Sequence, residues 1–384
     1  MSTVYLFNPE NDMALASGSP YYMAPANIKK MAADLSALPA WYAPSGSGVW
    51  MSDEWQVRWM QEEFGSLLDV DWLLEIPSSC RKICPWGWSH SLVHRLNGMG
   101  VSGSALSSDK QMDRLRMLSG RQQAVDLLPR LRVEHTIGES FLLTSFENLK
   151  AFEAKDERVL LKSPWSGSGK GIRMVEDLSD PSVYGWAKRV ISSQGAIVVE
   201  PYYNKVVDFA MEFYVGHEDV SFVGYSLFET DCRGIYKGNV LASNAMIEEE
   251  LSVYVSLDVL ASVRERCLKE LGRIYQGVYE GYLGVDMMIC REGNEFLVHP
   301  CVEVNLRMNM GVVSRIFYDR FLPDGVRGTY VIEYFSCQGD ALSFHECMKR
   351  DFPLIKDRNR IKSGYLSLSP VFQETSYLIY ALIK

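Results

Sequence analysis

Short blocks of apolar and polar residues alternate along the first hundred positions of the chain. Apolar runs at residues 4–7, 40–42 and 83–84 predict short strands, and helical or polar stretches separate them. This succession is typical of an open α/β layer with parallel strands. We therefore expect an N-terminal α/β domain over residues 1–106.

The pattern changes after Ser108, where DKQMDRLRML places Met112, Leu115 and Leu118 at helical spacing and indicates the start of a second domain. The elements predicted beyond it are strands at 159–162, 172–175, 196–200, 209–215 and 220–228, helices at 183–192 and 253–277, and a C-terminal strand pair around 364–383. We expect domain divisions at 107–200 and 201–384.

The stretch from Gly284 to Gly311 carries the most chemistry. Side chains alternate along a strand, so Glu303, Asn305 and Arg307 are expected on one face. A turn signal at residues 291–294 predicts an antiparallel hairpin that brings Asp286 alongside. Oxygen ligands of this kind suit Mg²⁺ held jointly with nucleotide phosphates. Alternation alone shows only a strand, so a half-buried hairpin with a polar face is an equal alternative.

Composition limits the classes of partner. The chain has 384 residues, 47% of them hydrophobic, and Lys plus Arg number 39 against 48 Asp plus Glu, for a net charge of -9. No basic run is long enough to follow a phosphodiester backbone, so we expect no nucleic-acid partner.

No apolar stretch approaches the length that spans a bilayer, and the N-terminus is expected to form a first strand, not a signal peptide. The eight cysteines are mostly scattered singly in apolar segments, which favours free thiols in a reducing cytoplasm. Cys80 and Cys84, with His90 and His94 nearby, lack the paired spacings of common zinc sites. We therefore expect a cytoplasmic protein without a membrane partner.

A glycine-dense loop follows the predicted strand at 159–162. It fits neither the Walker pattern nor the dinucleotide fingerprint, and a strand follows it in place of a helix. Glycine lets backbone N–H groups approach phosphate oxygens, and Lys162 can supply a fixed positive charge. An ordinary flexible hairpin is the alternative. The loop residues considered for phosphate binding are Ser166, Gly167, Ser168, Gly169 and Gly171.

The strand at 196–200 ends in Glu200-Pro201-Tyr202-Tyr203, where free backbone groups suit the edge of an adenine ring. Asp208 follows at a distance that lets it accept hydrogen bonds from ribose hydroxyls.

The order of these segments resembles the ATP-grasp superfamily over residues 105–320. The motifs that carry the resemblance are Asp109-Lys110, LLKSPWSGSGKGI (160–172), VVEPYY (198–203), GVDMMI (284–289) and EVNLRMNMG (303–311). The implied fold is a two-subdomain ATP-grasp unit with antiparallel sheets, in which the hairpin at 159–175 acts as a lid.

The resemblance also implies roles. Lys110 and Lys162 would contact phosphates, the backbone of Pro201 to Tyr203 would hold adenine, Glu200 its amino group and Asp208 the ribose. Asp286, Glu303 and Asn305 would bind Mg²⁺, with Mn²⁺ as an alternative ion. Arg307 would steady the phosphate or an acyl intermediate, and Lys237 and Asn239 lie where members often place a further contact.

Two loops of the N-terminal domain are substrate candidates. Residues 7–12 and 85–88 each follow a predicted strand, and an open α/β sheet places its crevice at the carboxyl ends of its strands. The candidate residues are Asn8, Glu10, Asn11, Asp12, Trp86 and Trp88. For the first loop, a helix over 13–16 with Asn11 or Asp12 as its N-cap is an equal and compatible alternative.

The function implied is an ATP-dependent ligase of the carboxylate-amine type. It would activate a carboxylate as an acylphosphate for attack by an amine or similar nucleophile, releasing ADP and phosphate. Two alternatives remain open: a phosphotransferase on the same scaffold, and a nucleotide-binding module without turnover. Small molecules or short peptides are the expected substrates, and a homodimer is left open because members are often dimeric.

Overall fold

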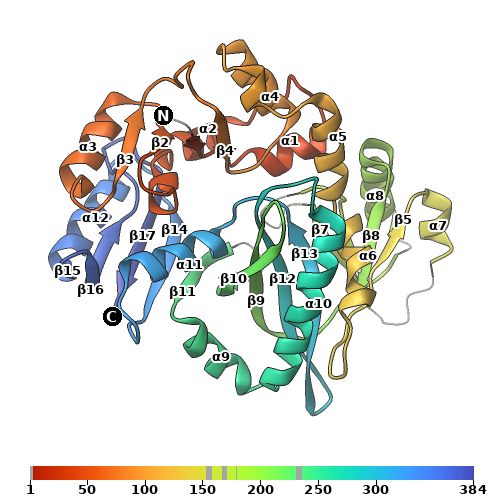
Figure 1. Ribbon diagram of the computed structural model, residues 1–384. Helices are drawn as coiled ribbons and strands as arrows, with labels where there is room; N and C mark the ends of the chain where they lie inside the picture. Colours follow the sequence, from red (N-terminus) through yellow and green to blue (C-terminus); the bar gives the residue numbers. More distant parts are fainter. Residues whose placement is uncertain (1–2, 153–157, 167–170, 179, 231–235) are drawn as a thin grey trace. The chain divides into compact units, whose positions relative to one another are not determined.

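The structure is a computed structural model that describes residues 3–152, 158–166, 171–178, 180–230 and 236–384. The chain forms two compact units (Figure 1). Unit 1 consists of Met1–Asp113, Lys237–Ile247 and Arg307–Lys384, and unit 2 of Arg114–Tyr236 and Glu248–Leu306. The domain divisions drawn from the sequence, at 106 and 200, remain a prediction.

Unit 1 begins with the expected parallel sheet. Its strands stand in the order β3-β2-β1-β4 and all pair in parallel. The bounds are β1 (Thr3–Leu6), β2 (Ser47–Trp50), β3 (Val70–Leu73) and β4 (Lys82–Pro85). Val4 and Leu6 point into a core with Ile83 and Leu92. The parallel α/β layer is therefore confirmed.

One predicted strand is wrong. Ala40 and Trp41 belong to a 3₁₀ helix, η1 (Leu38–Trp41), with Tyr42 at its C-cap, and the strand that completes the sheet is β2. Leu38 to Trp41 are all fully buried, and Pro39 stands in the first turn of the helix. A short apolar run that is buried on every side looks the same in sequence whether it is a strand or a helical turn.

Several helices of unit 1 lie between these strands or shortly after them along the chain. They are α1 (Asn11–Ser17), α2 (Ala26–Asp34), α3 (Glu54–Phe64), α4 (His90–Gly98) and η2 (Gly103–Ala105), and α5 (Asp109–Leu118) runs on into unit 2. Asp53 caps α3 by accepting a hydrogen bond from Trp55 N, and Ser89 caps α4 in the same way.

Unit 1 also holds an antiparallel sheet in the order β11-β14-β17-β16-β15. Its elements are β11 (Tyr236–Leu241), β14 (Gly328–Tyr334), β15 (Ile355–Asp357), β16 (Arg360–Ser367), β17 (Tyr377–Ile383), α11 (Met310–Phe321) and α12 (Asp340–Asp351). The expected C-terminal strand pair is confirmed. Trp41 donates its indole N–H to Leu368 O at 2.7 Å, which ties this sheet to the N-terminal layer.

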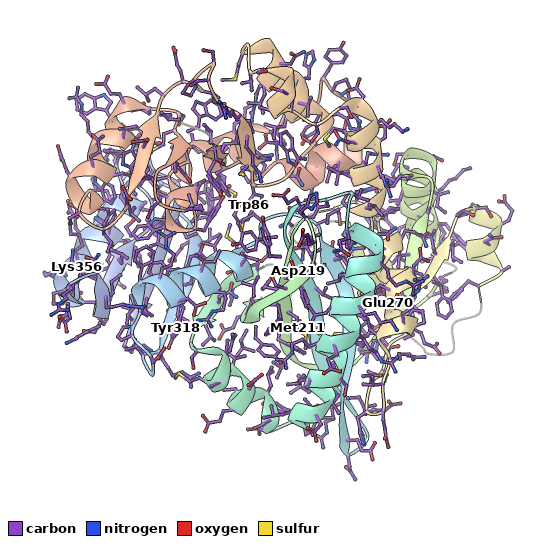
Figure 2. All side chains as sticks on the ribbon, viewed as in Figure 1. Trp86, Met211, Asp219, Glu270, Tyr318 and Lys356 are labelled. Atoms are coloured by element: carbon purple, nitrogen blue, oxygen red, sulfur yellow. The ribbon has the colours of Figure 1, made fainter. Side chains whose placement is uncertain are left out.

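Unit 2 contains four long antiparallel strands in the order β13-β12-β9-β10. They are β9 (Lys205–Val215), β10 (Val220–Thr230), β12 (Gly281–Glu292) and β13 (Glu295–Asn305), with α6 (Gln122–Leu131), α9 (Asn244–Ser252, which begins in unit 1) and α10 (Leu257–Tyr275). Met211 on β9 is fully buried within this sheet (Figure 2). The side of α10 that carries Val263, Cys267 and Leu271 is buried, as the helical period requires.

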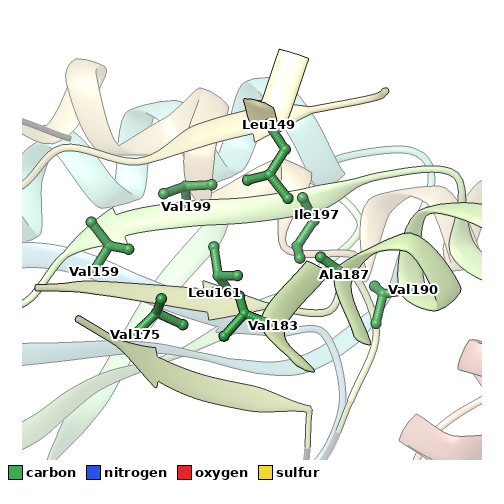
Figure 3. Close-up of a cluster of buried hydrophobic side chains, with 9 residues drawn as sticks. All are labelled: Leu149, Val159, Leu161, Val175, Val183, Ala187, Val190, Ile197 and Val199. Carbon is green, nitrogen blue, oxygen red and sulfur yellow. The ribbon is translucent and has the colours of Figure 1, made fainter. Parts of the chain in front are cut away.

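A smaller antiparallel sheet in unit 2 has the order β5-β8-β6-β7. Its elements are β5 (Phe141–Leu143), α7 (Phe146–Lys150), β6 (Val159–Lys162), β7 (Ile172–Val175), α8 (Pro181–Gln194) and β8 (Ile197–Pro201). Leu161, Ala187 and Ile197 meet in its apolar core (Figure 3). The strands predicted around the glycine loop are confirmed.

Among the described residues, no helix is both long and apolar enough to cross a membrane.

Candidate functional site

The end of the β12–β13 hairpin gathers the three predicted oxygen ligands, and we call Asp286, Glu303 and Asn305 the hairpin end. Asp286 stands directly opposite Glu303, and Asn305 Nδ2 donates to Asp286 Oδ2 at 3.0 Å. Directly opposed residues of an antiparallel pair point to the same face. Two carboxylates and one amide oxygen fit the preference of Mg²⁺ for a few hard oxygen ligands shared with phosphates.

A bulge lies directly before this position. The register of the hairpin shifts between Asp286 and Met288, and Pro300 falls in the extra residues on β13. Proline has no N–H to give to the ladder, so it suits a bulge. Bulges are common next to active sites because they re-aim the following side chains, here Cys301 to Glu303.

Among the described residues, no three His, Cys, Asp or Glu side chains come together as a metal cluster. The hairpin end therefore offers two carboxylates, and the amide of Asn305 would be the third protein ligand.

Arg121 contacts the hairpin end, and sequence reasoning missed it. Its Nη2 donates to Glu303 Oε2 at 3.0 Å, and its side chain is 4% exposed against 27% for Glu303. Its Nη1 donates to Ser163 O and to Ser166 Oγ, both at 2.6 Å. The only signal in the sequence was the break at Ser119-Gly120 after a predicted helix, which does not reveal a buried guanidinium.

Glu212 on β9 was also missed. It stands opposite Gly284, which in turn stands opposite Asn305, so all three positions share one face of the sheet. Glu212 is buried, and burial with this carboxylate nearby raises the pKa of Tyr236 well above its ordinary value. Asp208 and Glu212 are four residues apart on β9, so the period of a strand places them on one face, and this spacing is the signal that could have identified Glu212.

Lys162 and Glu200 form a buried ion pair in the small sheet. Lys162 Nζ lies 2.5 Å from Glu200 Oε2, and each side chain is only 4% exposed. Ser140 Oγ donates to Glu200 Oε1 at 3.0 Å. The structure thus brings together the residues expected at the phosphates and at the adenine amino group, and each stabilises the charge of the other.

His299 lies beside this pair and is fully buried. Neither of its ring nitrogens has a hydrogen-bond partner among the described residues. Its ring packs edge-on against Tyr203 at 5.4 Å, and a Cβ on Gly138 would lie 2.7 Å from its Nε2. Burial lowers the pKa of His299 to about 4, so the ring is neutral at physiological pH.

The residues expected to contact adenine lie at the end of β8 and directly after it. Tyr202 N donates to Arg158 O at 3.1 Å, and the guanidinium of Arg158 covers the Tyr202 ring at 4.5 Å. Tyr203 Oη accepts from Glu139 N at 2.8 Å, and burial raises the pKa of Tyr203 to about 12. Pro201 is the last residue of β8.

Asp208 lies on β9, opposite Met288 of the hairpin. Its carboxylate forms an ion pair with Lys205 at 2.5 Å and accepts from Thr230 Oγ1 at 2.9 Å. The group expected at the ribose is therefore already held by a cation and a hydroxyl.

The glycine loop is described only at its two ends. Ser163 N donates to Gly171 O at 2.8 Å and closes the loop at its root, and Gly171 has a left-handed φ of 81°. Gly167, Ser168 and Gly169 lie outside the described residues.

In unit 1, the two loops expected at the substrate brace each other, and we call residues 7–12 and 85–88 the braced loops. Asn8 Nδ2 donates to Gly87 O at 2.8 Å, and Gly87 N donates to Asn8 Oδ1 at 3.3 Å. The amide nitrogen of Asn11 donates to Gly87 O at 3.0 Å and to Trp88 O at 2.9 Å. Both asparagines are buried.

This bracing explains why the predicted helix cap is wrong. Helix α1 begins at Asn11, with Glu10 at the N-cap position and no side-chain capping bond. Asn11 and Asp12 are inside the first turn, because the Asn11 amide faces the Gly87 carbonyl and not the helix N–H groups. Glu10 instead lies 3.6 Å from Arg95.

Trp86 is buried against Phe7, with ring centroids 5.0 Å apart, and Trp88 is half-buried. The backbone of Trp86 bonds on both sides: its N–H donates to Leu6 O and its carbonyl accepts from Met308 N, each at 2.9 Å.

Alternation along one strand predicted that Arg307 shares a face with Glu303 and Asn305. It does not, because β13 ends at Asn305 and Arg307 lies beyond the strand. Its side chain pairs with Asp12 through Nε at 2.8 Å and Nη2 at 2.7 Å, and the two side chains are 16% and 25% exposed.

The remaining candidates lie in unit 1. Lys110 is exposed in the first turn of α5, Lys237 is exposed on β11, and Asn239 on the same strand is buried opposite Tyr330.

No protein-family model and no curated protein matches this chain in sequence. Solved structures do match it. A biotin carboxylase from Campylobacter jejuni has a TM-score of 0.53 at 13% identity, over 100% of this chain and 87% of that one. The carboxyaminoimidazole ribonucleotide synthase of Aspergillus clavatus, complexed with ATP, has a TM-score of 0.51 at 12% identity, over 100% and 94%.

A second structure of the Aspergillus clavatus enzyme, with ADP and 5-aminoimidazole ribonucleotide, has a TM-score of 0.52 at 12% identity over 90% of this chain and 94% of that one. These neighbours are ATP-grasp enzymes. The chain therefore has an ATP-grasp fold, and the fold class expected from the sequence is confirmed.

Proposed function

We propose that this protein is an ATP-dependent ligase that joins a carboxylate to an amine or similar nucleophile. The observation that carries the proposal is the hairpin end, where Asp286 faces Glu303 and bonds to Asn305. The ATP-grasp fold supports it, since structural neighbours of that fold are described with bound ATP or ADP. Mg²⁺, or Mn²⁺ in its place, would neutralise phosphate charge between these ligands.

The proposed chemistry needs positioning and charge more than a protein nucleophile. A carboxylate oxygen of the substrate attacks the γ-phosphorus, and the bond to the β,γ-bridging oxygen breaks as ADP leaves. The amine then attacks the acyl carbon of the acylphosphate, loses a proton to solvent, and expels phosphate. Lys162 and Arg307 are the cations proposed to oppose the phosphate charges.

The proposed nucleotide contacts follow the same order as the residues in unit 2. Glu200 and the backbone of Pro201 to Tyr203 would hold the base, and Asp208 the ribose. Binding would require Lys162 to share its charge between Glu200 and a phosphate, and Asp208 to exchange a bond with Lys205 for one with a hydroxyl. The buried charges of Lys162 and Glu200 would stay paired during this exchange, and the exposed Lys205 would be solvated by water.

The setting we propose is a reducing cytoplasm, and small molecules or short peptides are the proposed substrates. The support for the first is that all seven described cysteines are free.

ATP consumption in the presence of Mg²⁺, screened against a pool of carboxylates and amines, tests the proposal. A coupled product with ADP and phosphate in equal amounts supports ligation. A stable phosphorylated product would replace the ligase by a phosphotransferase, and nucleotide binding without any product would leave only a binding module.

A further inference from the structure

We propose that Arg121 is a positioning residue that holds the Glu303 carboxylate and the root of the glycine loop in one geometry, so that both meet the same Mg²⁺-nucleotide. This inference rests on the proposed function. It adds a residue that contacts neither a reacting atom nor the base, and acts through the two groups that it joins.

The contacts of Arg121 span three parts of unit 2. The residue stands at the start of α6, and its backbone N–H donates to Pro164 O at 2.9 Å. Its Nη1 bonds to Ser163 O and Ser166 Oγ, and its Nη2 to Glu303 Oε2. One buried guanidinium thus joins a helix start, the loop root and β13.

The loop root is anchored on the same side by Trp165. The Arg116 guanidinium covers the Trp165 ring at 4.2 Å, and Trp165 Nε1 donates to Arg116 O at 3.0 Å. A Cβ on Gly120 would lie only 3.1 Å from that ring, which explains the glycine directly before Arg121. The backbone of the loop root is therefore fixed. Because Arg121 bonds to this backbone and to Glu303, it holds the Glu303 carboxylate in a fixed position relative to the loop root.

The positive charge of Arg121 gives the residue an electrostatic role in addition to its structural one. Glu303 and Asp286 stand opposite each other, and two carboxylates side by side repel. The guanidinium offsets the charge of Glu303 and fixes its Oε2, which leaves the other oxygen for a cation. Without Arg121 the carboxylate would lose both its partner and its fixed direction, and the binding of a divalent cation depends on that direction.

Arg121→Met and Arg121→Lys, titrated by calorimetry with a non-hydrolysable ATP analogue, with and without Mg²⁺, test the proposal. We expect Arg121→Met to raise the Kd of the Mg²⁺-nucleotide roughly 10- to 100-fold, the range for losing a hydrogen-bonded charge pair. The Kd measured without Mg²⁺ should change much less. Lysine keeps the charge but cannot make all three directed bonds. The Kd of Arg121→Lys for the Mg²⁺-nucleotide should therefore lie between those of the wild type and Arg121→Met.

Arg130→Met is the matched control. Arg130 lies near the other end of α6 and pairs with Glu270 of α10 at 3.3 Å, so this variant also removes an arginine–glutamate pair. Figure 2 labels Glu270 on α10. It should leave the Kd unchanged.

The possible results distinguish a wrong function from a wrong role for Arg121. If the wild-type protein binds no Mg²⁺-nucleotide, the proposed function is wrong. If it binds and Arg121→Met binds as tightly, or loses affinity equally with and without Mg²⁺, the role of Arg121 is wrong. Should Arg121→Met not fold, Arg121→Lys decides by the same criterion: a Kd equal to that of the wild type overturns the proposal.

Discussion

The hairpin end and the braced loops both place polar side chains where strands end, but the two regions use them differently. In the braced loops, Asn8 and Asn11 are buried, and their side-chain amides form hydrogen bonds to the backbone around Gly87. At the hairpin end, Glu303 stays 27% exposed, and its carboxylate faces another carboxylate. Two carboxylates that are partly removed from solvent repel each other, and a bound cation would relieve that repulsion.

The difference teaches how to separate a brace from a site when both are rich in Asn, Asp and Glu. A brace satisfies its donors and acceptors internally, and its substitution should cost stability. A site keeps charge partly open to solvent, and its substitution should cost function. Each prediction below tests one side of this contrast.

The largest effect is expected for Glu303→Gln. The amide keeps the shape and an oxygen for Arg121, but removes the charge that would face Mg²⁺. We expect turnover to fall by about a thousandfold or more, because several kcal/mol of charge stabilisation are lost. Steady-state ADP release, read beside urea unfolding, measures both properties.

Glu295→Gln is the control for this variant, because Glu295 is an exposed carboxylate on the same strand, opposite Glu292. It should change neither property. If Glu303→Gln hydrolyses ATP at the wild-type rate, the hairpin end has a structural role like the braced loops and is not a metal site.

Local pattern was enough to predict much of this fold. The strands on either side of the glycine loop, the β12–β13 hairpin and the parallel N-terminal layer follow from alternation, turn residues and apolar runs. Residues 40–42 did not, because burial on all sides removes the periodicity that separates a strand from a helical turn.

The candidate site was predictable only where its members share one hairpin. Asp286 and Glu303 are 17 residues apart and joined by one turn, so the hairpin predicts that they share a face. The bulge between Asp286 and Met288, which the sequence does not predict, then sets them directly opposite each other. Arg121 reaches Glu303 across 182 residues, and Asn11 reaches the Gly87 loop across 76. Such contacts depend on how layers pack, and no local period encodes them.

A second prediction concerns His299, the buried histidine beside the Lys162–Glu200 pair. Burial lowers its folded-state pKa to about 4 from 6.5, so between these values only the unfolded chain takes up the proton. Stability attributable to His299 is thus complete above pH 6.5 and falls with pH, by about 3 kcal/mol once pH is below 4. Urea unfolding from pH 7 to 4 should show a shallower loss in His299→Leu.

His217→Gln serves as the control for that slope, since His217 is exposed on the connection between β9 and β10. A slope equally reduced in His217→Gln would contradict the assignment to His299.

The braced loops should respond to Gly87→Ala. A Cβ at Gly87 would lie 2.4 Å from the side chain of Asn11, which is itself buried and bonded. We expect about 2 kcal/mol of lost stability, as for other overpacked positions. Gly98→Ala, at the end of α4 with open space around it, should be neutral or slightly stabilising in the same denaturation experiment. Equal stability of the two variants would show that the loops do not brace each other.

The smallest effect is expected for Asp12→Asn. This variant tests the Asp12–Arg307 pair, which has features of both a structural brace and a ligand site. Asp12 belongs to a braced loop, yet its partner Arg307 is a proposed phosphate contact and both side chains are partly exposed. Losing a partly exposed bidentate pair should cost about 1 kcal/mol of stability. If Asp12 also orients the guanidinium toward a ligand, kcat should fall about tenfold while the KM for ATP stays within twofold. Glu54→Gln, which breaks the exposed Arg58–Glu54 pair, should change neither value. A stability loss with unchanged kcat would make Asp12–Arg307 a brace like Asn8, and would remove Arg307 from the proposed chemistry.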